Sequence, residues 1–323
     1  MRSAGSKGKG FASGSHHWQN FQENPIVKKP LVLGTRGSSL ALAQVNLLQE
    51  ALRASGVDVP IEVKKITTSG DRRSEYADVK ETGAGVKGLF TKEIEQALIE
   101  GEIDVAVHSC KDLPGRTAEG LAVRAVLERE ETSDVFISRD TEFAALPEGA
   151  TIATGSVRRK RQLVALRPGL VIEELCGNVP TRVEKLRATK RWAGIVLARA
   201  GLNRLGLELK DFCITALPIL PAIGQGAIAL QCRAADGNVA SVLARINHEP
   251  TFICIRAERE LLRLLNGDCR LPVGVATKLD GDALSMRAVV FSTEDEPQRT
   301  AQGSGSAGEP EALAGRLFQQ LNE

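Results

Sequence analysis

Basic and hydroxyl side chains stand where predicted strands give way to helices. Arg36 and Ser38 directly follow the apolar stretch Leu31–Thr35, so a guanidinium, a hydroxyl and backbone N–H groups converge on one place. This combination is typical of a carboxylate or phosphate site. For a lone T-R-G-S segment, a serine that merely caps the helix is the simpler interpretation. The functional interpretation therefore depends on recurrence.

The arrangement does recur along the chain. Thr154 and Ser156 close a strand-like segment, and Arg158 and Arg159 enter the next predicted helix at its positively polarised end. Two arginines in a first helical turn oppose the helix dipole, which favours an anionic ligand over a role in helix stability. Two later segments add Asn178, Thr181 and Arg182, and then Arg204. Together these residues predict a cleft for a ligand with several carboxylates.

One acid lies among these cations. Lys111 and Asp112 follow the predicted strand Ile103–Ser109, just before Pro114. An ionised carboxylate in a cation-lined cleft has a lowered pKa and stabilises positive charge that develops on a substrate. An ordinary turn residue explains Asp112 equally well when the motif is viewed alone. We interpret His108 as a packed strand residue rather than a base.

A glycine-dotted polar segment, residues 70–88, precedes a further candidate pair. A long segment of this kind is expected of a lid that closes over a cleft, and Lys87 and Phe90 stand at its end. A core position is the default interpretation of Phe90. Stacking on a flat aromatic ligand is the sharper alternative.

The cysteines differ in their surroundings. Cys269 lies in the turn-like segment NGDCRLP, whereas Cys213, Cys232 and Cys254 lie in apolar runs. A turn cysteine beside a cation is a candidate nucleophile or attachment point, although spacing alone leaves a structural role equally open. The sequence has no C-x-x-C pair and only four histidines, so we expect neither a zinc site nor a disulfide framework.

Composition limits the class of protein. The 323 residues carry 42 Lys and Arg against 40 Asp and Glu, which gives no overall reason to expect nucleic acid or a membrane as a partner. No apolar run approaches the roughly 20 residues that cross a bilayer, and we expect a cytoplasmic protein. Residues 1–29, rich in Gly, Ser and Lys, are predicted to be a flexible leader, with a short transit peptide as the less favoured alternative.

From residue 30 onwards, apolar strands, small turns and amphipathic helices alternate, which is typical of α/β units with mainly parallel sheets. The predicted organisation is an α/β lobe of residues 30–127 plus 227–244, a second α/β lobe of residues 132–220, and a small α+β domain of residues 249–323. The last domain is expected to contain an antiparallel hairpin with its turn at Asp280 and Gly281. A ligand is expected in the cleft between the lobes.

Read together, the segments resemble the hydroxymethylbilane synthase (porphobilinogen deaminase) family over nearly all of residues 30–323. The most specific stretches, in family order, are TRGSSLALAQ, KGLFTKEIE, DVAVHSCKDLP, TGSVRRKRQL, GNVPTR, AGLNRLG, LPAIGQGAIALQCR and NGDCRLPVG. The resemblance implies two lobes like those of type II periplasmic binding proteins, with a third, small C-terminal α+β domain that carries a cofactor cysteine on a loop facing the cleft.

By this resemblance, Cys269 forms a thioether to a dipyrromethane cofactor that the enzyme assembles from its own substrate. Asp112 assists loss of ammonia and stabilises a cationic azafulvene. Four porphobilinogen molecules are joined head to tail, and hydrolysis frees linear hydroxymethylbilane. Asp112 is also implied to bind the cofactor, and the other implied cofactor-binding residues are Lys87, Ser156, Arg158, Arg159, Arg182 and Arg204. The implied substrate-binding residues are Arg36, Ser38, Phe90, Lys111, Thr154, Asn178 and Gln225. No metal is implied, and a monomer is expected.

Some positions depart from the family pattern. Cys176 stands where arginine usually precedes G-N-V, and Pro180 stands where glycine usually precedes T-R. One arginine that would bind a carboxylate is therefore missing. We expect neighbouring arginines to compensate, with some loss of affinity for the cofactor or for the chain intermediates. Four residues before Lys87, where the family often has a lysine, this chain has Gly83. Lys80 is the candidate substitute for that lysine.

Two other functions stay open. A two-lobed carboxylate-binding protein would share the cleft and the arginines but has no use for NGDCRLP. A catalytically impaired paralogue would keep the fold and, with Cys176 in place of arginine, would assemble the cofactor poorly. The mass of the purified protein distinguishes these alternatives, because only an active synthase carries a full complement of added dipyrrole.

Overall fold

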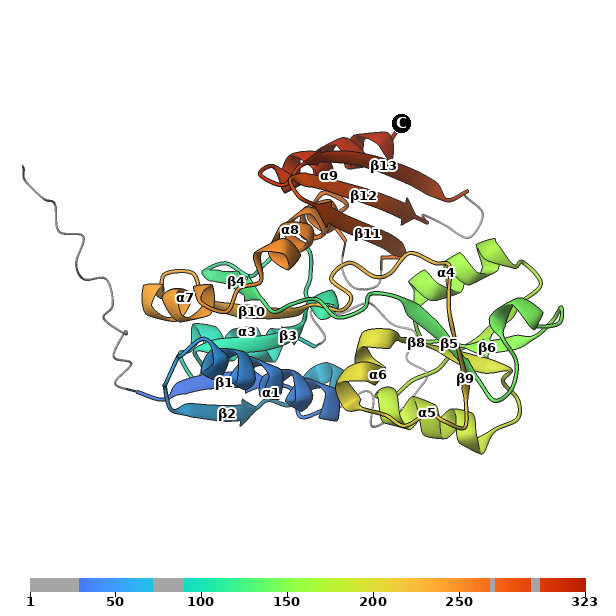
Figure 1. The fold of residues 1–323 in the computed structure, drawn as a ribbon, viewed down its shortest axis with the longest axis horizontal. Helices are drawn as coiled ribbons and strands as arrows, with labels where there is room; N and C mark the ends of the chain where they lie inside the picture. The colour runs from blue at the N-terminus through green and yellow to red at the C-terminus, as the bar shows by residue number, and fades with distance from the viewer. Residues whose placement is uncertain (1–28, 72–89, 268–270, 292–296) are drawn as a thin grey trace, which may run out of the picture.

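The computed structural model describes residues 29–71, 90–267, 271–291 and 297–323. They form two five-stranded mixed sheets and one three-stranded antiparallel sheet (Figure 1). Lys87 and Cys269 lie outside the described residues, as do Lys80, Gly83, most of the predicted lid and nearly all of the predicted leader.

The first lobe is built on a sheet in the order β2-β1-β3-β10-β4. Its strands are β1 (Leu31–Thr35), β2 (Ile61–Lys65), β3 (Val105–Ser109), β4 (Leu121–Val126) and β10 (Ile228–Arg233), and its helices are α1 (Ser39–Ala54), α3 (Lys92–Ile99) and α7 (Gly237–Ala244). Strand β10 runs antiparallel to both β3 and β4, whereas β1 is parallel to β2 and β3. Four strands therefore run one way and β10 runs against them.

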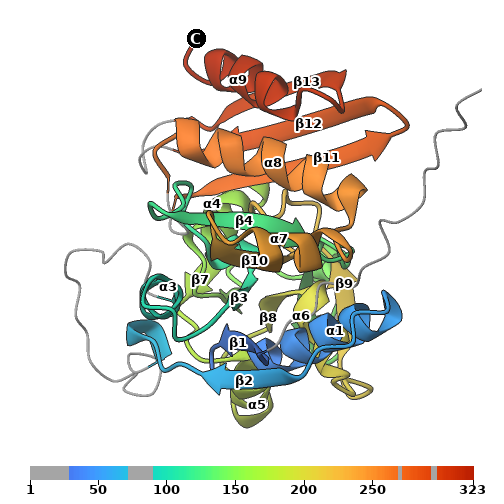
Figure 2. The same ribbon diagram turned by 90° about the vertical axis from the view of Figure 1, so that its left-hand side faces the viewer.

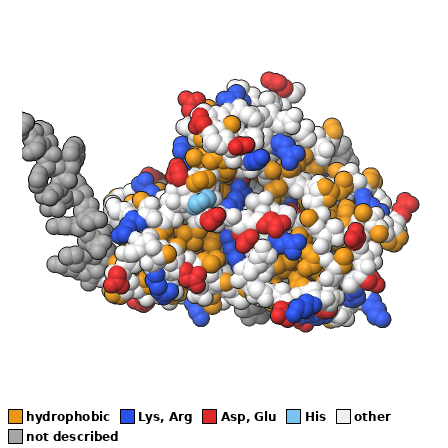
Figure 3. Space-filling model, viewed as in Figure 1, with side chains coloured by type: hydrophobic (Ala, Val, Ile, Leu, Met, Phe, Trp, Pro, Cys, Tyr) orange, Lys and Arg blue, Asp and Glu red, His pale blue; other side chains and the backbone are white. Residues whose placement is uncertain are grey.

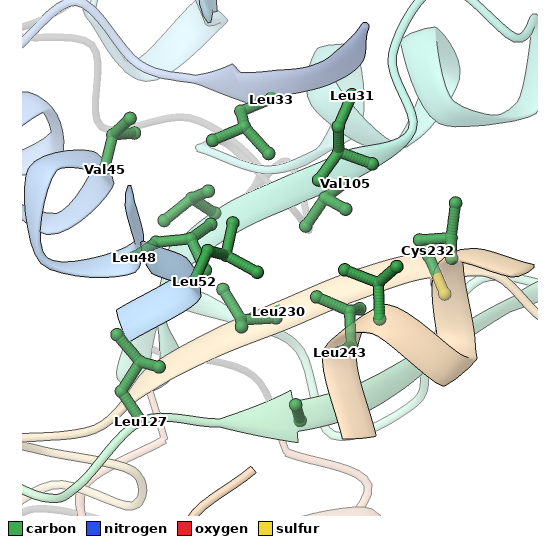
Figure 4. Close-up of a cluster of buried hydrophobic side chains, with 14 of the residues drawn as sticks. Leu31, Leu33, Val45, Leu48, Leu52, Val105, Leu127, Leu230, Cys232 and Leu243 are labelled. Atoms are coloured by element: carbon green, nitrogen blue, oxygen red, sulfur yellow. The ribbon is translucent and has the colours of Figure 1, made fainter. Parts of the chain in front are cut away.

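Helix α1 packs on this sheet through one apolar face. Val45, Leu48 and Leu52 recur at helical spacing, which places them on the same side of the helix. They share a buried cluster with Leu33 of β1 and Leu230 of β10 (Figure 4). Full burial of one such leucine contributes about 1.5–3 kcal/mol. This packing fixes where β1 ends and α1 begins, which is where Arg36 stands.

The second lobe repeats the same topology in the order β7-β6-β8-β5-β9. Its strands are β5 (Asp134–Ser138), β6 (Thr151–Ala153), β7 (Val171–Glu173), β8 (Gly194–Ala198) and β9 (Cys213–Ala216). Its helices are α4 (Val157–Leu166), α5 (Val179–Ala188) and α6 (Arg199–Leu205), with a short 3₁₀ turn, η2 (Phe143–Ala145). Here β5 is the reversed strand. The shared order, with one strand reversed, confirms the predicted type II periplasmic-binding-protein-like lobes.

Two segments cross between the lobes, one from β4 into β5 and the other from β9 into β10. Each crossing delivers the reversed strand of the lobe it enters. The two sheets are therefore joined by a pair of adjacent connections rather than one, and we call residues 127–133 and 217–227 the hinge. Backbone bonds tie the two connections together, from Glu130 N to Gly226 O at 3.1 Å and from Leu127 N to Ile228 O at 3.2 Å.

The C-terminal domain consists of α8 (Glu249–Leu264), β11 (Val273–Asp280), β12 (Ala283–Val290), β13 (Arg299–Ser306) and α9 (Pro310–Gln320). The predicted hairpin is confirmed: β11 and β12 pair in antiparallel register, and Gly281 in their turn has a φ of 57°. Strand β13 was not predicted, because its sequence RTAQGSGS is rich in glycine and serine. A Cβ at Gly303 would lie 3.2 Å from Leu317 of α9, so this strand needs glycine to let the helix approach.

The C-terminal domain is anchored to both hinge segments, and Figures 1 and 2 show it stacked on the lobes with α8 beside β4. Glu258 of α8 is fully buried and accepts from Arg129 Nη1 at 2.6 Å and Nη2 at 3.0 Å. Its Oε2 also accepts from Gly224 N at 2.8 Å, while Arg129 Nε donates to Gln225 O at 2.8 Å. One buried carboxylate thus meets both crossings between the lobes.

The described helices include none that is long and apolar enough to span a membrane. Figure 3 shows acidic and basic side chains interspersed over one face of the molecule. This mixture matches the near balance of 42 basic and 40 acidic residues in the sequence.

Candidate active site

A pocket of about 80 Å³ opens at the carboxyl ends of β1 and β3. Parallel neighbouring strands end at the same edge of a sheet, so the segments that follow them meet there. Residues from three predicted motifs line the pocket, namely Arg36, Ser38, Phe90, Lys111 and Asp112, together with His108. The structure therefore brings together five of the residues that the sequence marked as catalytic or substrate-binding.

Asp112 ends the 3₁₀ turn η1 (Cys110–Asp112), which directly follows β3. Its Oδ2 lies 3.9 Å from Arg36 Nη1, and the two side chains are 28% and 23% exposed. The turn keeps the carboxylate at the pocket wall instead of letting it extend into solvent. Asp112 thus remains reachable by a ligand while lying within the field of a guanidinium.

Arg36 has a second acidic partner that the sequence interpretation missed. Asp71 Oδ1 accepts from Arg36 Nε at 3.0 Å and from Nη2 at 2.5 Å, while Thr68 donates to Oδ2. Burial opposes ionisation of Asp71, yet the bonds from Arg36 and Thr68 hold its pKa below the usual value. Its only signal in the sequence is an acid directly after Thr-Ser-Gly.

Phe90 packs on the guanidinium of Arg36, with 4.2 Å from the Arg36 Cζ atom to the ring centroid. Both residues line the pocket, so Phe90 is more than a core residue. Cation–π contact of this kind is worth about 0.5–1 kcal/mol at an exposed site and more when desolvated. The ring and Asp71 together hold Arg36 in one orientation.

Lys111 has a pKa below the usual value for a lysine. Burial is the main cause and the charge of Arg159 is the second, and together they lower the pKa of Lys111 to about 8. Asp112 and Asp134 oppose the shift but do not cancel it. The ammonium is therefore available to pair with a carboxylate at neutral pH and is lost in mildly alkaline solution.

Several of the predicted hydroxyl and amide ligands act as helix caps. Ser38 Oγ accepts from Ala41 N at 3.3 Å, and Ser156 Oγ accepts from Arg159 N at 3.4 Å. Asn178 Oδ1 accepts from Thr181 N at 2.9 Å. Thr154, which is buried, accepts from Ser156 N at 3.3 Å. These bonds account for the residue types at α1, α4 and α5, and ligand binding by the same side chains stays a prediction.

Arg158 and Arg159 meet an internal anion. Both are buried, and both pair with Asp134 at 2.7 Å, Arg158 through Oδ2 and Arg159 through Oδ1. Burial opposes ionisation of Asp134, but the two guanidiniums hold its pKa well below the usual value. Asp134 thus explains how two cations are tolerated at the start of α4. A role for either arginine toward a bound ligand stays a prediction.

Gln225 and Arg204 lie at the hinge rather than at the pocket. Gln225 is 1% exposed, and its Nε2 donates to Thr132 O at 2.7 Å and to Asp134 Oδ1 at 2.9 Å. Arg204 Nη2 donates to Gly226 O at 2.6 Å. Both side chains therefore hold the crossing segments in place, and direct substrate or cofactor contact by them is untested.

The segment after β7 carries the departures from the family pattern. Cys176 is exposed, and Lys185 Nζ donates to its carbonyl oxygen at 3.1 Å. Pro180 falls in the first turn of α5, where a missing N–H leaves no helical bond unmade, so the helix tolerates it. Arg182 Nε donates to Gly177 O at 2.6 Å. Burial first and the charge of Arg159 second lower the pKa of Arg182, while Asp112 opposes the shift.

The arrangement suits a ligand that carries both carboxylates and N–H donors. Arg36 and Lys111 offer positive charge from one wall of the pocket, and Asp112 offers an acceptor beside them. The described residues include no group of His, Cys, Asp and Glu that could hold a metal ion. Charge stabilisation by fixed side chains is the chemistry that these described residues can perform.

Comparison with known families gives matches over almost the whole folded region. Residues 31–241 match "Porphobilinogen deaminase, dipyromethane cofactor binding domain", and residues 252–323 match "Porphobilinogen deaminase, C-terminal domain". Among curated relatives, the porphobilinogen deaminase of Syntrophomonas wolfei is 44% identical over 90% of this chain and 95% of its own length. That of Desulforudis audaxviator is 46% identical over 92% and 96%.

Two solved structures illustrate more distant likenesses. The GluR0 ligand-binding core in complex with L-glutamate covers 72% of this chain and 97% of its own, with 10% identity and a TM-score of 0.43. A periplasmic substrate-binding protein of an ABC transporter from Coxiella burnetii gives a TM-score of 0.39 at 11% identity.

Proposed function

The chain belongs to the porphobilinogen deaminase family of transferases, which act with a dipyrromethane cofactor in tetrapyrrole biosynthesis, and we propose that Asp112 is its catalytic residue and Cys269 its cofactor anchor. The substrate is porphobilinogen, four molecules of which are joined into hydroxymethylbilane. The observation that carries the proposal is that Asp112, Arg36 and Lys111 line one pocket.

Each of these three side chains has a distinct task. Arg36 and Lys111 bind the acetate and propionate groups of porphobilinogen, because both are cations in a partly desolvated pocket. Asp112 accepts from the pyrrole N–H and stabilises the positive charge that develops on the ring as ammonia leaves. The carboxylate lies 3.9 Å from Arg36, which holds it at the pocket wall for this purpose. Phe90 keeps Arg36 oriented and forms an apolar wall of the pocket.

The residues of the second lobe fit the dipyrromethane group, which supplies the pyrrole end to which the substrate units are added. Arg158 Nε is buried with no hydrogen-bond partner among the residues that the structure describes. Arg182 lies in the shared field of Asp112 and Arg159. We propose that Arg158, Arg159, Arg182 and Arg204 hold the carboxylates of this group, with Ser156 and Lys87, and that Thr154, Asn178 and Gln225 contribute on the substrate side.

The proposal extends to the setting in which the enzyme works. We propose a cytoplasmic monomer. We also propose domain limits of 30–127 plus 227–244, 132–220 and 249–323, since each of the three sheets is assembled from strands within one of these sets.

Intact mass of the purified protein tests the anchor. Wild-type protein is expected to weigh one dipyrromethane more than its sequence mass and to give the acidic Ehrlich colour of a bound pyrrole. Cys269→Ala is expected to show neither, because the thioether has no sulfur. Cys213→Ala removes a partly buried cysteine of β9 and is the matched control that should retain the added mass.

Turnover separates the catalytic from the anchoring role. Asp112→Asn, supplied with preformed hydroxymethylbilane for loading, should carry the cofactor mass and lose kcat by about a thousandfold, in the range found for removal of one charge-stabilising group. Unmodified wild-type protein after incubation with porphobilinogen would instead support a carboxylate-binding protein. A mixture of loaded and unloaded wild-type protein would support the impaired paralogue.

A further inference from the structure

A chain of three buried polar residues runs from the interior of lobe 1 to the pocket. Gln231 Nε2 donates to Glu95 Oε1 at 2.8 Å, and Gln231 Oε1 lies 3.0 Å from His108 Nε2. None of the three is more than 9% exposed. Glu95 comes from α3, Gln231 from β10 and His108 from β3, so three elements contribute one side chain each.

Small residues of the sheet leave space for these three side chains. His108 stands opposite Ala229 and Gln231 stands opposite Ala106, which puts all four on one face of the β3–β10 pair. Because both alanines are small and fully buried, the larger His108 and Gln231 reach each other diagonally between them. Packing alone would be better served by apolar residues at these positions, since buried polar groups stabilise little even when they are paired.

The bonding pattern favours one arrangement of protons. Glu95 takes the amide hydrogens of Gln231, which turns the amide oxygen toward the ring of His108. An oxygen at that place requires Nε2 to carry the hydrogen. Burial lowers the pKa of His108 to about 4, and the charge of Arg259 acts in the same direction. The ring is therefore neutral at physiological pH, and its Nδ1 has a free lone pair.

From this geometry we infer that the Glu95–Gln231–His108 chain holds His108 as an acceptor for the aminomethyl ammonium group of the substrate. His108 lines the same pocket as Arg36, Lys111 and Asp112. The two cations suit the substrate's carboxylates and repel its ammonium, so an unprotonated ring nitrogen in the same pocket as Asp112 provides the place for that group. Gln231 and Glu95 are positioning residues, because they act on the substrate only through His108. The inference rests on the proposed function.

Nitrogen NMR of the full-length holoenzyme without substrate tests the Glu95–Gln231–His108 chain independently of substrate binding. The sequence has four histidines, so selective ¹⁵N-histidine labelling gives few signals. His108 is expected as a single neutral tautomer with Nε2 protonated between pH 6 and 8, values chosen to bracket an ordinary histidine pKa of about 6.5. Glu95→Gln keeps the shape but frees the Gln231 amide to turn, and should give mixed tautomers. A protonated or Nδ1-protonated His108 in the wild type would overturn the inference.

Kinetics then test what the ring binds. His108→Asn is expected to raise the KM for porphobilinogen about tenfold, the loss of one hydrogen bond to a charged group, with kcat changed by less than roughly threefold. The Ki of a pyrrole with the same acids but methyl in place of aminomethyl should not change. An equal loss for both compounds would show that His108 does not contact the ammonium.

His248 serves as the matched control for His108. His248 hydrogen-bonds to Thr251 and does not line the pocket. His248→Asn should therefore leave the KM for porphobilinogen and the Ki of the methyl analogue unchanged. If the wild type turned over no porphobilinogen, the proposed function would fail while the tautomer result would still stand. If turnover were normal and His108→Asn bound porphobilinogen like the wild type, only this inference would fail.

Discussion

Arg159 donates to a single oxygen of Asp134 twice, through Nε at 3.0 Å and Nη2 at 2.7 Å, and both residues are buried. Asp134 opens β5 directly after the hinge, and Gln225 of the other crossing donates to the same oxygen at 2.9 Å. The carboxylate therefore fixes the arginines at the start of α4 and ties them to the segments that join the lobes.

Replacing Asp134 by Asn should destabilise the protein strongly. The change leaves the guanidiniums of Arg158 and Arg159 buried without a counter-charge, a loss that typically costs about 3–5 kcal/mol. Urea unfolding measures it. Asp211→Asn breaks an exposed pair with Arg187 and should have little effect on stability, because solvent screens that pair. Equally small losses of unfolding free energy in the two variants would mean that Asp134 is not the counter-charge that stabilises the buried arginines.

Acid should destabilise the protein through the same carboxylate. The pKa of Asp134 in the folded state lies below its usual unfolded value of 3.8, because the charges of Arg159 and Arg158 outweigh the opposing effect of burial. Its contribution is therefore present above that unfolded value and is lost as pH falls through the folded pKa. Unfolding free energies measured from pH 6 downward should fall more steeply below about pH 4 for the wild type than for Asp134→Asn. Parallel curves would contradict the assignment.

The pKa of Lys111, near 8, should appear in substrate binding. Burial and Arg159 lower it, so the ammonium is lost as pH rises through that value. The KM for porphobilinogen should therefore rise above about pH 8, and Lys111→Arg, which stays protonated, should shift this rise to higher pH. Measuring kcat/KM from pH 6.5 to 9.5 checks it. A rise in KM at the same pH in the variant would assign the titration to another group.

The alternation of apolar, polar and amphipathic segments predicted the strand–turn–helix units. It thereby placed Arg36 before α1, Ser156 at the N-cap of α4 and Arg182 in the first turn of α5. The meeting of Arg36 with Asp112 requires β1 and β3 to be neighbours, which no spacing states. Asp134 was missed because it reads as the end of a charged linker, and its partners Arg158 and Arg159 stand a full strand further along. Such long-range pairing of a buried acid leaves no local periodic signal.

The missing arginine at Cys176 offers a test of compensation. Cys176 Sγ is exposed and lies 3.7 Å from Glu174 Oε1, and Lys185 donates to the Cys176 carbonyl oxygen. Cys176→Arg would restore a guanidinium beside Arg182 without disturbing the core. We expect faster cofactor loading and about tenfold tighter retention of bound intermediates, the effect of one charged hydrogen bond. Intact-mass spectrometry of the enzyme during turnover measures both quantities.

Two controls decide between charge and geometry at this position. Cys176→Ser keeps the size and adds no charge, so loading should match the wild type. Cys176→Lys adds charge without the planar fork and should give part of the gain, because an ammonium cannot hold a carboxylate through two parallel bonds. If Cys176→Arg left both loading and turnover unchanged, the neighbouring cations would already compensate in full, and the expected loss of affinity in the natural chain would be wrong.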